Sequence, residues 1–221
     1  MSELPAHEGH RPWAPHHHGE TAVSHLENLA VARLGVATAG HALLDVGCGD
    51  GRRLRGSGAA LAFGVDLTPR MLARPQGANP LVAADVLALP FARLTFDVVW
   101  CRLVIGHVRA MEAAYAELSR VCRMGGAVIV TDISAEATAA GRRCTHPGPD
   151  GTTQDIEPFT HSIERQAVAA FDFGLRLERR QDGVVDPSVM HFYEEAGQLP
   201  AYEAQLGLPL VLALLWRKDT A

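Results

Sequence analysis

Apolar and polar positions alternate in blocks along the middle of the chain. Short apolar runs are separated by polar stretches, of which residues 109–122 most clearly have the spacing of a helix. The apolar runs are residues 42–46, 61–66, 80–84, 96–101 and 127–132. Buried apolar runs that alternate with helices are typical of a parallel sheet covered on both faces. The pattern therefore predicts an α/β fold in which these runs are strands of one sheet.

The pattern changes on both sides of this region. Residues 21–35 have the spacing of an amphipathic helix, with Leu26 and Leu34 on its apolar face. Residues 133–160 are rich in Gly, Pro, Thr and Asp and are long for a connection, which favours a functional loop or lid. Beyond them we expect a helix, a strand, a helical or irregular stretch and a last strand, at residues 161–174, 175–181, 187–206 and 209–216.

Charge and cysteine content argue against several function classes. The chain has 221 residues, and its 20 Lys and Arg against 25 Asp and Glu give a net charge of −5. A general binder of nucleic acid or of anionic membranes needs a basic surface instead. The longest apolar run, residues 209–216, falls far short of the roughly 20 residues of a membrane helix. With no C-x-x-C pair and no apolar signal-peptide core, we expect a cytoplasmic protein with reduced thiols.

The segment LLDVGCGDG, residues 43–51, carries the most specific signal. An apolar strand leads into Asp45, and Gly47, Gly49 and Gly51 then alternate with other residues, so the backbone can adopt positive φ and approach a ligand closely. A dinucleotide fingerprint, G-x-G-x-x-G, needs a third glycine where this chain has Arg52. The spacing therefore argues against a nicotinamide oxidoreductase and still predicts a polar ligand at the carboxyl ends of the strands.

This D-x-G-x-G-x-G pattern resembles motif I of the class I S-adenosylmethionine-dependent methyltransferases. Later segments resemble further motifs of that family in the same order, namely residues 63–72, 82–91, 96–108 and 117–133. The chain departs from the family at Met124, where a proline is usual, and at Arg93 and Leu94, where the family tends to be acidic or Gly-rich. The resemblance implies a Rossmann-like, mostly parallel seven-stranded sheet of order 3-2-1-4-5-7-6, with S-adenosyl-L-methionine as cofactor and S-adenosyl-L-homocysteine as product.

The resemblance also implies roles for individual residues. Asp66 would bind the ribose hydroxyls, Asp85 would accept from the adenine amino group, and the Val86 amide would meet a ring nitrogen. The ammonium group of the cofactor would lie near Asp45 and the Gly47 and Cys101 carbonyls. The full predicted cofactor set is Asp45, Gly47, Cys48, Gly49, Asp66, Leu67, Met71, Asp85, Val86, Cys101 and Arg102.

The cofactor carboxylate needs a cation or backbone amides. Arg102, just past the fourth strand, is a candidate, with pairing to a helix as the alternative role for its side chain. Arg11 and His25, from the N-terminal segment, are further candidates.

Histidines are the candidate bases, because an unperturbed imidazole titrates near neutral pH. His161 opens the helix after the lid, where many relatives face substrate, and His107 lies in the loop after the fourth strand. His146 lies on the expected lid, and Asp132 ends the fifth strand, where it contacts substrate or caps the next turn. The three consecutive histidines at 16–18 make a poor closed metal site, because their side chains diverge, so we expect no metal.

The sequence thus predicts one domain, residues 1–221, that methylates an O, N or C atom of a small molecule, with specialised metabolism as its setting. We divide it into an N-terminal lid and helix (1–35), a cofactor-binding core (36–135), and a substrate lid with C-terminal strands (136–221). Expected partners are the acceptor and a second copy of the chain, and neither nucleic acid nor membrane. Two alternatives stay open: a cofactor-binding enzyme of non-methylating chemistry, and a non-catalytic cofactor-binding partner protein.

Overall fold

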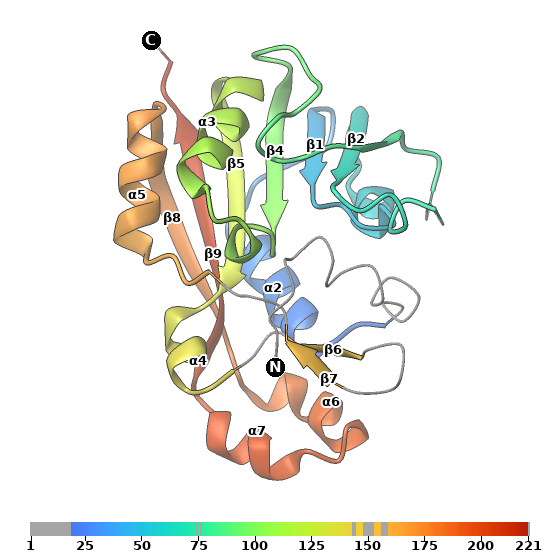
Figure 1. Cartoon of the computed structure of the whole chain (residues 1–221), viewed down its shortest axis with the longest axis vertical. Coiled ribbons are helices and arrows are strands. Elements are labelled where there is room, and N and C mark those ends of the chain that lie inside the picture. The colour runs from blue at the N-terminus through green and yellow to red at the C-terminus, as the bar shows by residue number, and fades with distance from the viewer. Residues whose placement is uncertain are drawn as a thin grey trace.

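A seven-stranded sheet forms the centre of the described part of the computed structural model (Figure 1). The structure describes residues 19–73, 75, 77–142 and 159–220, together with the backbone of residues 145–147 and 153–155. The strands of this sheet are β1 (Ala42–Val46), β2 (Leu61–Asp66), β3 (Leu81–Ala83), β4 (Phe96–Arg102), β5 (Cys122–Ile133), β8 (Leu175–Val184) and β9 (Pro209–Lys218).

The strand order is β3-β2-β1-β4-β5-β9-β8. Strands β1 to β5 pair in parallel, and β9 runs antiparallel between β5 and β8. Numbered within the sheet alone, this is the order 3-2-1-4-5-7-6, which confirms the predicted fold class. The carboxyl ends of the parallel strands meet at one edge, where open α/β sheets bind their ligands.

Helices cover both faces of the sheet. Leu44 of β1 packs in one cluster with residues of α3 (Met111–Val121) and α5 (Ile163–Asp172). Leu43 packs in a second cluster with Ala30 of α2 (Ala22–Arg33). Successive residues of a strand point to opposite faces, so α2 lies behind the sheet in Figure 1 while α3 and α5 lie in front. The three helices confirm the predictions for residues 21–35, 109–122 and 161–174.

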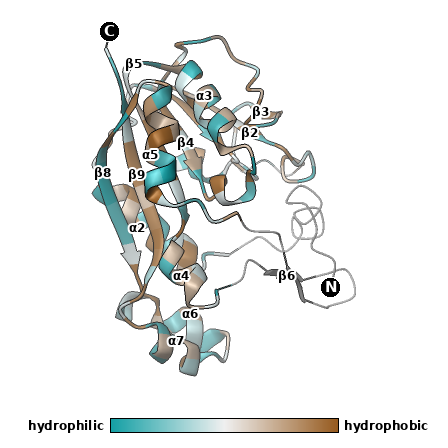
Figure 2. Ribbon diagram, turned by 60° about the vertical axis from the view of Figure 1, so that its left-hand side comes forward, coloured by the Kyte–Doolittle hydropathy of each residue, from teal (hydrophilic) through white to brown (hydrophobic). Residues whose placement is uncertain are grey.

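The two C-terminal strands differ in polarity because only one of them is central. β9 is buried along nearly its whole length, whereas half of the residues of edge strand β8 are exposed. Figure 2 shows this as a brown β9 beside a largely teal β8. Charged side chains on an edge strand oppose pairing with another chain.

Strand β5 is longer than the predicted run of residues 127–132. It begins at Cys122, directly after α3, and Cys122 pairs with Phe96 before an irregular register leads into the regular ladder at Ala127. Gly125 has a φ of +71°, which a glycine adopts without strain. The Gly125-Gly126 segment is therefore an irregular start of the strand.

The remaining elements are short. They are α4 (Ala135–Ala139), the two-stranded pair β6 (Thr145–Pro147) and β7 (Thr153–Asp155), α6 (Met190–Glu195), α7 (Leu199–Gln205), and the 3-10 helices η2 (Arg52–Gly56), η3 (Ile105–His107) and η4 (Pro187–Val189). Residues 1–18 of the predicted N-terminal lid and helix (1–35), and much of the lid predicted at 133–160, lie outside the described residues. Within the described ranges, no helix combines the length and the apolar character needed to cross a membrane.

Candidate functional site

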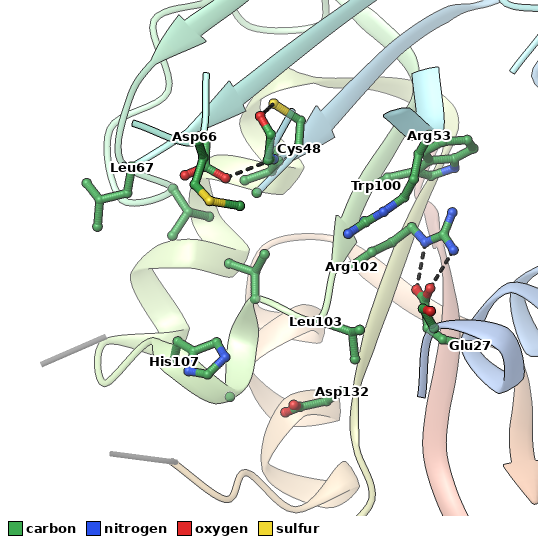
Figure 3. Close-up of a pocket in the computed structure, with 18 of the residues that line it drawn as sticks. Glu27, Cys48, Arg53, Asp66, Leu67, Trp100, Arg102, Leu103, His107 and Asp132 are labelled. Atoms are coloured by element: carbon green, nitrogen blue, oxygen red, sulfur yellow. Dashed lines mark hydrogen bonds and ion pairs between the residues drawn. The ribbon is translucent and has the colours of Figure 1, made fainter. Parts of the chain in front are cut away.

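A cavity of about 1130 Å³ opens at the carboxyl edge of the parallel strands (Figure 3). Its walls come from α2, from the turn after β1, from the ends of β2, β4 and β5, and from η3 and α4. Segments distant in sequence meet here because the parallel strands all end at this edge. The fold therefore places the glycine turn and the residues after β2, β3 and β4 around one space, as predicted.

The turn after β1 requires its glycines. Gly47, Gly49 and Gly51 have φ values of +74°, +59° and +77°, which side chains rarely tolerate. A Cβ atom on Gly47 would lie 2.2 Å from Cγ2 of Val104. The Gly47 and Cys48 amides donate to the Val65 carbonyl at 2.8 and 2.9 Å, which ties the turn to the end of β2. The backbone of this turn therefore lines the cavity directly.

Two carboxylates flank the turn on the side of β2 and β3. Asp66 accepts the Gly49 amide at 2.9 Å and the Thr68 amide at 2.8 Å. Asp85 accepts the Leu87 amide at 2.9 Å. Both residues line the cavity, and a carboxylate has acceptor positions to spare for a diol or an amino group. The apolar residues predicted beside them, Leu67, Met71 and Val86, line the cavity as well, so this end suits a nucleoside.

Replacing Asp66 with alanine is expected to weaken the binding of S-adenosylhomocysteine by about 1–3 kcal/mol, through the lost hydrogen bonds. Isothermal titration calorimetry of both proteins measures the difference. Asp172→Ala, at the end of α5 and outside the cavity lining, is the control. An unchanged affinity in Asp66→Ala would show that the end of β2 does not contact the ligand.

A second pair of charges lies under the glycine turn. Asp45 is fully buried, and neither of its carboxylate oxygens has a hydrogen-bond partner among the described residues. Nη1 of Arg53 lies 3.7 Å from Oδ1 of Asp45, too far for a hydrogen bond, and is likewise buried without a partner in that part of the chain. Burial raises the pKa of Asp45, while the charge of Arg53 opposes that rise. Both groups retain bonding capacity beside the cavity, which Arg53 lines.

Arg53 was not among the predicted residues. The signal was the pair Arg52-Arg53 directly after the last glycine of the turn, because a cation there is well placed for an anionic group. The sequence alone does not show that the Arg53 side chain approaches Asp45.

Arg102 has the helix-pairing role that was its alternative. Its guanidinium donates to both carboxylate oxygens of Glu27, at 2.6 and 2.5 Å, and to Oδ1 of Asn28 at 2.6 Å. Glu27 also accepts the Thr131 hydroxyl at 2.8 Å. Burial opposes the ionisation of Glu27, but the hydrogen bond and the charge of Arg102 outweigh it and hold the pKa of Glu27 below its usual value. Arg102 lines the cavity, with its donors directed at α2 (Figure 3).

The chemistry of these donor sets fits S-adenosylmethionine. Asp66 and Asp85 match an adenosine, as the family resemblance implied. Arg53 lines the cavity with an Nη1 that has no hydrogen bond among the described residues, which matches the carboxylate of an amino-acid tail. Asp45 is fully buried and outside the lining, so its contact with the ammonium stays a prediction. The side chain of Cys101 is fully buried and absent from the lining. The contact of its carbonyl with the cofactor ammonium therefore stays a prediction.

The structure separates the two predicted histidine bases. His107 lines the cavity from η3 (Figure 3). His161 does not line the cavity. Its Nε2 lies 2.9 Å from the Val108 carbonyl, and its backbone carbonyl accepts a hydrogen bond from the Gln166 side chain. That placement favours positioning of the loop after η3 over proton transfer by His161. It argues against this predicted base.

Other predicted candidates fall elsewhere. His25 pairs with Glu20 at 3.3 Å, its ring lies tilted against that of Phe192, and it is outside the cavity lining. Arg11, residues 16–18 and the side chain of His146 lie outside the described residues. Within the described ranges, no group of three His, Cys, Asp or Glu residues could hold a metal ion. Asp132, by contrast, is buried and lines the cavity at the end of β5.

Sequence comparisons agree with this geometry. Residues 44–130 match the family model described as a methyltransferase domain. A malonyl-[acyl-carrier protein] O-methyltransferase of Enterobacter lignolyticus (strain SCF1) is 32% identical over 143 residues, which are 62% of this chain and 54% of that protein. The methyltransferase GfsG of Streptomyces halstedii is 33% identical over 114 residues, 46% of this chain and 41% of that protein. The matches thus span about half the length of these curated relatives.

A structural comparison extends over more of the chain. An S-adenosylmethionine-dependent methyltransferase from Mesorhizobium loti has a TM-score of 0.69 at 17% identity, over 89% of this chain and 100% of that one. This likeness shows the shared fold, and the matched family model covers the glycine turn and the ends of β2, β3 and β4 at the cavity. The family match over residues 44–130, the methyltransferase relatives and the shared fold together support a class I S-adenosylmethionine-dependent methyltransferase.

Proposed function

We propose that this chain transfers a methyl group from S-adenosyl-L-methionine to an O, N or C atom of a small molecule. The observation that carries the proposal is the donor set at one cavity. Asp66, Asp85 and Arg53 line it, and the buried Asp45, outside the lining, lies 3.7 Å from Arg53 with no hydrogen-bond partner among the described residues. The cavity of about 1130 Å³ is at the upper end of the size of ligand pockets, so it has room for an acceptor beside the cofactor.

The bound cofactor would supply an electrophilic methyl group on a sulfonium sulfur. The residues of the chain bind the cofactor and orient the acceptor. The glycine turn, Asp66 and Asp85 hold the adenosine, and Asp45 and Arg53 hold the charged tail. Helix α2 and the loop at η3 cover the site and exclude water, while Leu103, Val104 and Phe159 offer an apolar surface to the acceptor. Orientation of the acceptor opposite the sulfur then supplies much of the rate enhancement.

The names of the relatives support a small or carrier-bound acceptor. A malonyl group on a carrier protein is the named substrate of one relative, and its reacting part is small. We propose an acceptor of specialised metabolism, for which the Ala-, Arg- and Gly-rich composition is the support, and a cytoplasmic enzyme with reduced thiols.

A thermal-shift experiment tests the cofactor. At about 100 times its dissociation constant, a ligand stabilises the folded protein by roughly 2.7 kcal/mol. At about 2–4 °C per kcal/mol for a chain of this size, S-adenosylmethionine and S-adenosylhomocysteine should raise the unfolding midpoint by about 5–10 °C. NAD is the control and should not shift it.

Mass spectrometry of acceptor candidates then tests the reaction, because methylation adds one CH₂. A midpoint that moves with none of the adenosyl ligands would contradict the proposed function. Binding with products of unchanged mass would favour a cofactor-binding enzyme of another chemistry.

A further inference from the structure

Asp132 places a carboxyl group at the end of the cavity away from the nucleoside residues. It lies one residue before the end of β5, lines the cavity and is 8% exposed. Figure 3 shows Asp132 and His107 at one end of the site and Asp66 and Cys48 at the other. A ligand bound at Asp66 and Asp85 would therefore leave Asp132 facing a second molecule.

Two backbone amides fix this carboxyl group. The Ile133 amide donates to its Oδ1 at 2.8 Å, and the Gly106 amide donates to it from η3. A Cβ atom on Gly106 would lie 2.5 Å from Oδ1, so a larger residue there would displace the carboxyl group from this position. A carboxylate has about four acceptor positions, and two amides leave others available on the cavity side. The group is held in one orientation without being saturated.

The charge of Asp132 is not compensated by the described residues. No arginine, lysine or histidine in that part of the chain forms an ion pair with it. The Cys101 thiol of β4 and the Tyr115 phenol of α3, whose pKa values burial raises, interact with it electrostatically. His107 of η3 lies at the same end of the cavity (Figure 3), and Arg109 and Arg142 are further charged groups of the lining. Its partner on β9 is Leu212. Burial raises the pKa of Asp132 to about 7, against the effect of the two amides.

We propose that Asp132 is the general base that takes the proton of the methyl acceptor, and that the acceptor group is therefore a hydroxyl or an amine. The inference rests on the proposed methyl transfer. The acceptor oxygen or nitrogen forms a bond to the methyl carbon, and the carbon–sulfur bond breaks with its electron pair going to sulfur. The acceptor proton goes to the Asp132 carboxylate, which returns it to solvent after product release. The positive charge of the sulfonium and the negative charge of the carboxylate both disappear.

This assignment distinguishes the chain from relatives named for a malonyl substrate. A carboxylate acceptor has no proton to lose at neutral pH and would be repelled by an ionised Asp132 at the same end of the cavity. A hydroxyl or an ammonium group instead donates to it. The nearby lining of Val23, Leu103, Val104, Ile133 and Phe159 suits an apolar body behind that group.

Matched probes test the recognition directly. The protein saturated with S-adenosylhomocysteine is titrated with 3-phenylpropylamine and with 3-phenylpropanoate by ligand-observed NMR, at about pH 8, where a group of pKa about 7 is mostly ionised. The amine should bind at least about tenfold more weakly to Asp132→Asn than to the unaltered protein, while the propanoate should bind Asp132→Asn more tightly. Asp172→Asn, on the exposed end of α5, should match the unaltered protein.

The same pair of proteins tests catalysis with 3-phenylpropylamine and 3-phenylpropanol, read as S-adenosylhomocysteine formed. Asp132→Asn should lower kcat by about 10²–10⁴-fold, with the rise of the rate through about pH 7 lost. The proposal is overturned if the amine binds both proteins equally, if the propanoate prefers the unaltered protein, or if no probe binds at millimolar concentration. A failure of S-adenosylhomocysteine itself to bind, seen in its own titration, would instead contradict the proposed function.

Discussion

Replacing Glu27 with alanine should lower the free energy of unfolding by about 3–5 kcal/mol, because it leaves the Arg102 guanidinium buried without its counter-charge. Glu27 and Arg102 are 2% and 4% exposed and share two short hydrogen bonds. Chemical denaturation of both proteins measures the loss. Glu20→Ala is the control, because the Glu20 side chain is 52% exposed and its ion pair is screened by solvent.

A second variant separates the loss of the pair from the cost of an unpaired charge. The double replacement Glu27→Leu with Arg102→Met removes both charges and should recover much of the stability, since well-packed apolar residues often replace a buried ion pair at little cost. A loss below about 1 kcal/mol in Glu27→Ala would show instead that the pair behaves like a surface ion pair.

The same pair gives a pH dependence with a definite sign. The folded protein holds the pKa of Glu27 below the usual value of 4.5. The stabilisation from Glu27 is therefore fully present above about pH 4.5 and is lost as the pH falls through the lower pKa of the folded state. In Glu27→Gln this part of the acid sensitivity should disappear.

The stability of this pair bears on the site, because α2 forms one wall of the cavity. Thr21, Val23, Ser24, Glu27 and Asn28 all line it. The Glu27–Arg102 pair joins that wall to the end of β4, and the Thr131 hydroxyl joins it to β5. Helix α2 is thus held in place by β4 and β5, whose bonding residues lie 75 and 104 positions further along the sequence than Glu27.

Local patterns made the fold predictable, and pairings over long sequence distances did not. The strands follow from apolar runs, and the glycine turn from residues that sit together in the chain. Glu27 lies on the inner face of a helix whose apolar spacing predicts burial of leucine and alanine there, and its partner is Arg102, 75 positions away. No local pattern reports such a pairing, so the choice between two roles for Arg102 needed the structure.

The same limit applies to the candidate base. His161 and His107 were favoured because an unperturbed imidazole titrates near neutrality. The pKa of Asp132 reaches a similar range only through burial at the end of β5, against the lowering effect of the Ile133 and Gly106 amides. A sequence shows the carboxylate at the end of the strand, but it does not show the desolvation that changes its chemistry.

Arg53→Gln should weaken the binding of S-adenosylhomocysteine by about 10–150-fold, which corresponds to about 1.5–3 kcal/mol for hydrogen bonds to a charged group. The reason is that Arg53 is the cation beside Asp45 with an unused donor, whereas Arg102 is engaged by Glu27. Titration calorimetry with three ligands isolates the group involved. They are S-adenosylhomocysteine, its decarboxylated analogue S-adenosyl-3-thiopropylamine, and 5′-methylthioadenosine, which lacks the whole tail.

If Arg53 binds the carboxylate, Arg53→Gln should bind the decarboxylated analogue and 5′-methylthioadenosine as the unaltered protein does. Equal weakening of all three ligands would mean that Arg53 only supports the turn. The control is Arg33→Gln, at the exposed end of α2 and outside the cavity lining. Because the charge of Arg53 opposes the burial-driven rise in the pKa of Asp45, the variant should also raise that pKa further. In the variant, a protonated Asp45 would then bind the ammonium of S-adenosylhomocysteine less well as the pH falls. The decarboxylated analogue keeps this ammonium, so it should show the same weakening, but only at low pH.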